Sequence, residues 1–200
     1  MKRKIKHQVK QQGSEQIYKE SWKYLKHIRK SIYLIALLFL CGALIGYAFS
    51  DFFAYYFDDI IKGIIEETKG LGFVEMIFFI FGNNLMSSIA GFLLGVFFGV
   101  FPIFVSLFNG TLIGYVYNRA SAIDGPWVIW RLFPHGIFEL PAVFISLGLG
   151  LRLGGFIFSK NKKKAFISRL KEGMKVFLAF VIPLLIIAAV IEGILIFFVG

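Results

Sequence analysis

The sequence predicts an all-helical (all-α) polytopic membrane protein with about five transmembrane helices, kinked or broken around a buried polar cluster. Composition is the first reason, since 58% of the 200 residues are hydrophobic and only 17% are charged. A globular protein usually carries about 25% charged residues. The second reason is that the apolar residues form long runs of membrane-spanning length. No region outside these runs is long enough to form a soluble core of its own.

The apolar runs divide the chain into two parts. A basic cytoplasmic amphipathic arm is expected at 1–31, followed by a single transmembrane helical domain at 32–200. An amphipathic outer connector is expected at 50–72 and a basic cytoplasmic loop at 155–174. The spans are predicted at about 32–49, 73–97, 101–118, 128–154 and 175–199.

The distribution of positive charge predicts the orientation. Ten of the 22 Lys and Arg residues precede residue 32, and eight more lie between Arg152 and Lys175. Such blocks beside apolar spans are typical of cytoplasmic segments. We therefore expect a multi-pass protein of the cell membrane with a cytoplasmic N-terminus. No nucleic-acid recognition module accompanies the net charge of +10, so no nucleic-acid partner is expected.

Glycines at four-residue spacing predict close helix packing. They form one pair in the first span and a longer series in the second, comprising Gly42, Gly46, Gly91, Gly95 and Gly99. Such spacing lets another helix approach closely, either within the chain or from a second copy. Five spans in 200 residues make a thin bundle, which favours a homo-oligomer in the lipid bilayer.

The fourth span begins with an unusual polar stretch. Arg131, His135 and Glu139 are four residues apart, so a helix places them on one stripe. Pro134 and Pro141 interrupt this stripe, and each tends to bend or break a helix. Ionisable groups and broken backbone are both costly in hydrocarbon. The stretch is therefore expected to face protein or a wet cavity.

Other spans carry polar residues at a similar distance from their outer ends. Asn is rare at this depth because its amide must find hydrogen-bond partners. A shared buried cluster of seven residues is the economical inference: Arg131, His135, Glu139, Asn83, Asn84, Asn109 and Glu192.

Several roles are open for this cluster. The residues could satisfy one another and hold a kinked helix in place. They could bind a proton or cation in a transport cavity. His135 and Glu139 are weak candidates for half of a metal site, completed by Glu192 or Glu75. The spans contain no recognised catalytic motif, so neither an enzyme nor a cofactor is expected.

Two stretches resemble a known family. One is Pro-His-Gly-Ile-Phe-Glu-Leu-Pro at 134–141, followed by Gly148-x-Gly-Leu-Arg152. The other leads from Asn83-Asn84 through Gly95 and Pro102 to Asn109-Gly110. Together they resemble the stage II sporulation protein M-like integral membrane proteins. The resemblance implies a polytopic protein, and the named member resembles a scaffold that recruits cell-wall hydrolases to the septum.

Two functions are therefore expected, in this order. The first is a membrane scaffold or assembly factor that oligomerises and docks membrane or cell-envelope proteins. The alternative is a small secondary transporter or channel component that uses the His/Glu/Asn cluster for proton or cation coupling. A Glu139→Gln change separates them, because the amide keeps most hydrogen bonds but loses the titratable charge.

Overall fold

The computed structural model describes residues 2–198, with side chains at 15–129 and 136–198. All elements in these residues are helical, which confirms the predicted fold class. Five helical stretches of the described chain are long and apolar enough to cross a membrane: 15–48, 73–96, 100–124, 136–158 and 162–198. The main helices are α1 (Lys2–Ala48), α2 (Ser50–Thr68), α3 (Phe73–Leu93), α4 (Val100–Asp124), α5 (Ile129–Gly154), α6 (Lys162–Val176) and α7 (Ile182–Phe198).

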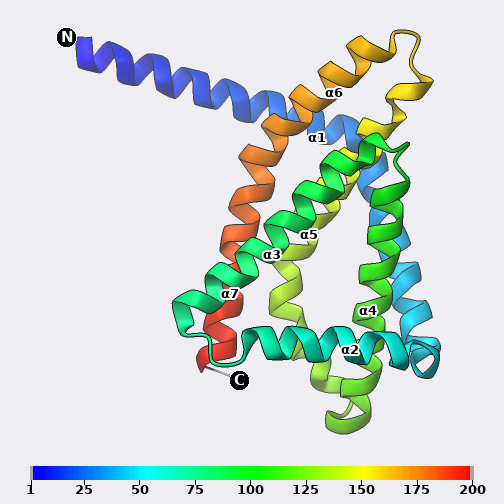
Figure 1. The fold of residues 1–200 in the computed structure, drawn as a ribbon. Coiled ribbons are helices and arrows are strands. Elements are labelled where there is room, and N and C mark those ends of the chain that lie inside the picture. The colour runs from blue at the N-terminus through cyan, green and yellow to red at the C-terminus, as the bar shows by residue number, and fades with distance from the viewer. Residues whose placement is uncertain (1, 199–200) are drawn as a thin grey trace.

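Helix α1 contains both the predicted basic arm and the first predicted span. Its backbone is helical throughout, with no break at the predicted boundary near residue 31. The N-terminal part extends away from the other helices, and the C-terminal part descends beside α4 (Figure 1). Ring contacts hold the arm against the bundle, because Tyr18 and Trp22 lie 6.1 and 6.0 Å from Phe180 between ring centroids.

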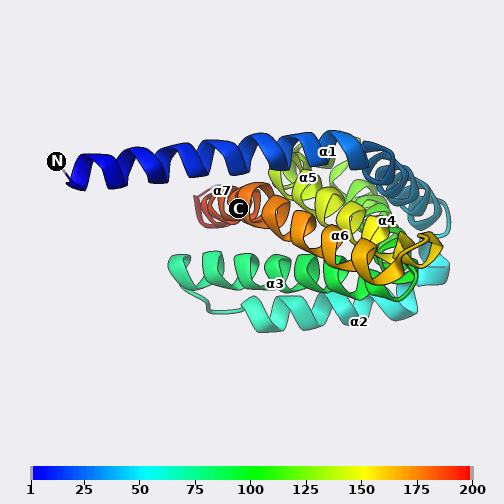
Figure 2. The same ribbon diagram turned by 90° about the horizontal axis from the view of Figure 1, so that it is seen from above.

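Helix α2 forms the predicted connector between the first two spans. It lies across one end of the molecule, roughly perpendicular to α4 (Figure 1), and it stays on one side of the bundle when seen from above (Figure 2). Apolar and acidic residues alternate along it, and large side chains such as Phe52 and Tyr55 are exposed. This pattern suits a helix lying at a membrane surface.

Two helical segments are longer than predicted. Helix α4 continues to Asp124 instead of ending near residue 118, and it stops at Gly125, whose φ of +81° favours glycine. Arg119 in this extra turn forms an ion pair with Asp51 of α2 at 3.2 Å. The basic segment predicted as a loop at 155–174 contains helix α6, whose N-cap Asn161 accepts a hydrogen bond from the Lys164 N–H at 3.1 Å.

The two prolines predicted to bend or break a helix, Pro134 and Pro141, do not interrupt one. The irregular helical segment lies beside Pro183 instead. Helix α5 continues through both Pro134 and Pro141. A π-helical segment, Phe177–Val181, instead joins α6 to α7 just before Pro183. Such a segment can accommodate the proline's missing N–H without ending the helix. The irregular helical geometry therefore lies in the last span, which contains Glu192.

The main hydrophobic core lies where α1, α3, α5 and the π-helical segment meet. It is built from Leu25, Ile28, Phe92, Ala142, Leu149, Leu153, Val176, Phe177, Val181 and Leu185. A smaller cluster of Met76, Ile80 and Ala189 joins α3 to α7. The main core includes residues of the arm, Leu25 and Ile28, and Val176 at the end of α6.

Candidate functional site

Glycines bring α1 and α4 into backbone contact. A Cβ added at Gly46 would lie 1.9 Å from the Thr111 carbonyl oxygen, and one at Gly114 would lie 1.9 Å from the Ala43 carbonyl oxygen. Gly42 and Gly110 make the same close approach one turn away. Only glycine fits at such distances. The predicted Gly42/Gly46 pair therefore packs within the chain, and we call this contact the α1–α4 seam.

A second glycine seam joins the end of α3 to α5. A Cβ at Gly95 would meet the Gly150 carbonyl oxygen at 2.2 Å, and a Cβ at Gly150 would meet the Gly91 carbonyl oxygen at 2.2 Å. Gly154 approaches Gly99 in the same way. The predicted 91/95/99 series is thus also used inside one chain. We call this contact the α3–α5 seam.

The two seams hold α3 and α4 against different helices. These helices are joined by a tight turn in which Phe98 and Gly99 have φ values of +58° and +74°. From that turn the two helices diverge toward α2 (Figure 1). Each is held by a different partner, α4 by α1 and α3 by α5. The space between them is therefore not closed by backbone packing.

A cavity of about 490 Å³ occupies this space. Its lining comes from six helices: α3 and α4 form the sides, and α1, α2, α5 and α7 contribute the rest. This volume lies within the range of small-molecule sites. The lining is mixed, with apolar residues such as Phe79 and Leu147 beside amides, hydroxyls and carboxylates.

Five of the seven predicted cluster residues line this one cavity. They are Asn83 and Asn84 of α3, Asn109 of α4, Glu139 of α5 and Glu192 of α7. The other two, Arg131 and His135, have side chains outside the described residues. The structure therefore places residues from four predicted spans around a common space, and their functional role stays a prediction.

The two carboxylates are partly enclosed by protein. The Oε2 atoms of Glu139 and Glu192 are both buried, and each residue also faces the cavity. They come from α5 and α7, which pack against each other. The two carboxylates therefore border the same space from neighbouring helices.

Three hydroxyl residues of the cavity were missed from the sequence. Ser87 and Ser88 lie four residues after Asn83 and Asn84, so they continue the same polar stripe of α3. This spacing was a usable signal. Thr68, at the end of α2, offered no comparable pattern, because the position of α2 depends on the tertiary fold.

Helix α2 is fastened to α4 beside the cavity. The buried Tyr115 donates a hydrogen bond from its hydroxyl to Asp58, and its ring lies 5.4 Å from the Phe57 ring. Arg119 also donates to the Tyr115 hydroxyl at 3.4 Å. These contacts anchor the middle of α2. Its final residues, including Ile64 and Thr68, extend to the cavity.

The metal hypothesis receives no support from the described side chains, which contain no group of three or more metal-binding residues. Glu75, one of the weak candidates, accepts a hydrogen bond from the Gly72 N–H at 2.8 Å and so caps α3. Glu192 does share the cavity with Glu139. A metal site involving His135 lies outside the described residues.

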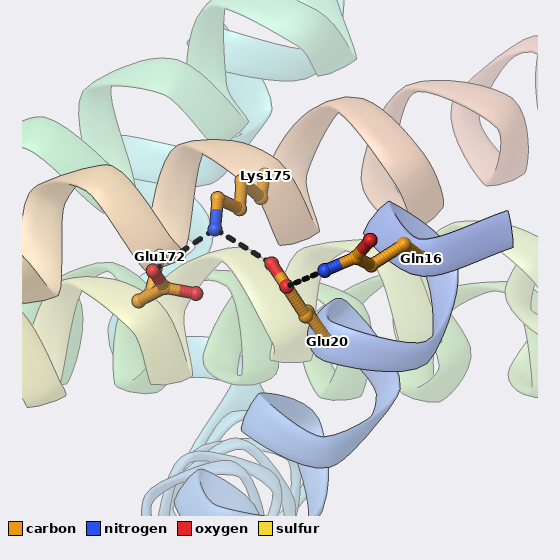
Figure 3. A network of polar contacts seen from close by, with 4 residues as sticks. All are labelled: Gln16, Glu20, Glu172 and Lys175. Carbon is orange, nitrogen blue, oxygen red and sulfur yellow. Dashed lines mark hydrogen bonds and ion pairs between the residues drawn. The ribbon is translucent and has the colours of Figure 1, made fainter. Parts of the chain in front are cut away.

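The opposite end of the molecule is held together by an ion-pair network. Lys175 donates to Glu20 of α1 at 2.9 Å and to Glu172 of α6 at 3.1 Å. Figure 3 shows both carboxylates turned toward this lysine, with Gln16 donating to Glu20 from the other side at 3.2 Å. The network ties α1 to the α6–α7 helix. It lies at the basic end, remote in the fold from α2.

These features define a multi-pass membrane protein with a polar cavity between its spanning helices. The chain belongs to the stage II sporulation protein M family, whose model matches residues 35–195. It is also similar to an uncharacterized protein of Methanocaldococcus jannaschii, with 27% identity over 180 residues, covering 82% of this chain and 80% of the relative. No solved structure matches it.

Proposed function

We propose that this protein is a membrane transport or channel component that binds a proton or small cation in the cavity between α3 and α4. The observation that supports this most is the convergence of Glu139, Glu192 and Asn109 on one space within apolar helices. Ionisable residues at membrane depth are costly, and they are typical of ion and proton pathways.

The chemistry of the lining suits a cation. Carboxylate and amide oxygens are ligands that hard cations accept, and serine hydroxyls add further oxygen donors. Among the described side chains that line the cavity, none is Lys, Arg or His. A cation entering the space would therefore meet oxygen atoms from several different helices.

Access to the cavity would be controlled from the end where α2 lies. The final residues of α2 contribute to the lining, and the following connector contains Gly70 with a φ of +83°. No neighbouring atom lies within 4 Å of a Cβ built at Gly70 or at Gly63. In this proposal the lightly packed end of α2 moves, while Tyr115 holds its middle.

The decisive experiment measures transport in liposomes with the purified full chain. Loss of a proton or cation flux in both Glu139→Gln and Glu192→Gln is the expected result, because each removes a titratable charge and keeps the side-chain shape. Glu67→Gln is the matched control, since Glu67 is exposed on α2 and does not line the cavity. Wild-type flux in both cavity variants would contradict the proposal.

Orientation is proposed from the charge distribution. The arm and α6 would face the cytoplasm, and α2 would face the opposite side. In a chain whose single Cys41 is replaced by Ser, a cysteine at Glu67 should react with a membrane-impermeant maleimide in intact cells. A cysteine at Lys163 should react only after the cells are opened. The reverse pattern would overturn the orientation.

A scaffold or assembly role is the second candidate, favoured by the family to which the chain belongs. The projecting part of α1 gives it a specific location, because this segment extends beyond the bundle (Figure 2). Deleting residues 2–14 should then abolish partner capture in membrane cross-linking but leave flux intact. The glycine seams offer no further support for a homo-oligomer, since both are used within one chain. Cross-linking that yields only monomer would count against oligomerisation.

A further inference from the structure

A second polar site lies at the basic end, around the last residue of the Gly148-x-Gly-Leu-Arg152 motif. Arg152 occupies the last turn of α5, and its Nη2 lies 3.0 Å from Nε2 of His27 on α1. Arg169 of α6 reaches the same place, where its Nη1 donates to the Arg152 carbonyl oxygen at 3.0 Å. Three helices thus bring two guanidinium groups and an imidazole together.

Groups of the protein accept hydrogen bonds from Arg169. Its guanidinium caps the C-terminal end of α5 and also donates to the Ser159 hydroxyl at 3.1 Å. A cation is favourable at that position because the helix C-terminus carries partial negative charge. Gly155 makes room for it, since a Cβ there would lie 3.1 Å from Arg169 Nη1.

The Arg152 guanidinium is not fully satisfied by groups of the protein. Its Nε is buried and has no hydrogen-bond partner, although a charged donor in that state is costly. Its side-chain contacts are with the His27 imidazole and the Tyr24 hydroxyl, and neither group is a carboxylate that could supply negative charge. A half-buried guanidinium beside a second guanidinium therefore lacks a counter-charge.

Nearby carboxylates do not supply that counter-charge. Glu20 and Glu172 are the acidic residues nearest in sequence to the α1 and α6 residues of this site, and both bind Lys175 instead (Figure 3). Across the described side chains, no carboxylate forms an ion pair with Arg152 or Arg169. Every acidic residue of the chain lies within these described side chains.

We infer that Arg152, Arg169 and His27 form a binding site for a phosphate group, which in a membrane is the headgroup of an anionic phospholipid. Guanidinium groups hydrogen-bond phosphate oxygens strongly, and Ser159 adds a hydroxyl at the same point. Basic pockets between helices at a membrane surface bind such headgroups. Arg152 lies near the end of the apolar stretch 136–158, where the headgroups of a membrane crossed by this stretch would lie. A free phosphate ion has the same chemistry and is the other source of the ligand.

The test measures the thermal stability of the purified full chain in detergent. Phosphatidylglycerol should raise the apparent melting temperature of the wild type more than phosphatidylcholine does. In Arg152→Gln the apparent affinity for phosphatidylglycerol should fall by about tenfold or more, as expected for a lost charged hydrogen bond. This variant keeps the main-chain oxygen that Arg169 binds, so the cap of α5 remains.

Arg29→Gln is the matched control, because Arg29 lies on α1, is exposed and changes the net charge equally. It should keep the full response to phosphatidylglycerol. An equal loss in Arg29→Gln would show a general charge effect and overturn the proposed site.

Two further results decide the source of the phosphate and the role of Arg152. Inorganic phosphate alone, compared with chloride at equal ionic strength, should give no stabilisation if the ligand is a lipid. Stabilisation by inorganic phosphate that depends on Arg152 would assign the site to a soluble phosphate instead. If Arg152→Gln lowers the melting temperature but keeps the lipid response, Arg152 is only structural and the inference fails.

Discussion

Helices α1 and α4 are distant in sequence yet share a backbone-to-backbone interface, whereas α3 and α4 are joined by a short turn and diverge. The α1–α4 seam has glycines on both helices, with carbonyl oxygens where side chains would otherwise lie. The facing sides of α3 and α4 carry Asn84 and Asn109 instead. Small residues allow close packing, and the polar residues here line the space left open.

Proximity along the chain therefore does not decide which of these membrane helices pack together. In lipid there is little hydrophobic force between helices, so close van der Waals contact and hydrogen bonds decide. Ser106 adds such a bond to the α1–α4 seam, donating to the Ile35 carbonyl oxygen at 2.7 Å. A bundle of two seams with a cavity between them follows. Substitutions in the seams should therefore change stability more than substitutions in the cavity.

The largest effect is expected in the α1–α4 seam. Gly46→Ala should destabilise the protein by about 3 kcal/mol, because the new Cβ would overlap the Thr111 carbonyl and force the helices apart. Unfolding by SDS from mixed micelles would measure this. Gly82→Ala is the control, since its Cβ meets nothing within 4 Å. That control should gain up to about 1 kcal/mol from helix propensity. Equal effects at both sites would show that the seam does not control packing.

An intermediate effect is expected where α2 is fastened to α4. Tyr115→Phe removes the hydroxyl that binds Asp58 and Arg119 but keeps the ring contact with Phe57. The loss should be about 1–2 kcal/mol, as for a hydrogen bond from a buried hydroxyl to a charged group that is itself partly exposed. Hydrogen exchange should increase along α2 and remain unchanged in the α1–α4 seam. Unchanged exchange in α2 would mean that its aromatic contacts suffice.

The smallest effect on stability is expected in the cavity. Asn84→Leu places an apolar side chain where space is available, so stability should change by less than about 1 kcal/mol. The same variant should reduce flux in liposomes if the cavity carries ions. A large loss of stability would instead indicate that Asn84 holds the fold through its hydrogen bonds.

Much of the architecture was predictable because hydrophobic length is a strong signal. Five apolar runs predicted five spans, and five helical stretches of the described chain have the required length and composition. Span boundaries were less predictable, since α4 continues past Arg119 to Asp124 and Arg119 there pairs with Asp51 of α2. Helix α5 likewise remains helical through Pro141. Local proline chemistry cannot show which interruptions a bundle accommodates.

The candidate site was partly predictable for a similar reason. Polar residues in hydrocarbon are costly, so Asn83, Asn109 and Glu139 stood out before any fold was available. Thr68 did not, because it is an ordinary residue at the end of a surface helix. The Arg152 site was also hidden, since a cation near a helix end has an ordinary explanation. Only the positions of His27 and Arg169 show that its charge is left uncompensated.

The amino-acid pattern was sufficient to predict an all-helical membrane protein with polar groups buried in its spans. It did so because burial in lipid restricts which residues each segment can contain. Which helices pack against each other became known only from the fold. The glycine spacing allowed either intrachain or intermolecular packing, and the fold used it within the chain. The glycine spacing specifies a surface for close packing but not the helix that packs on it. In the fold, α1 pairs with α4 and α3 pairs with α5, and the cavity lies between α3 and α4.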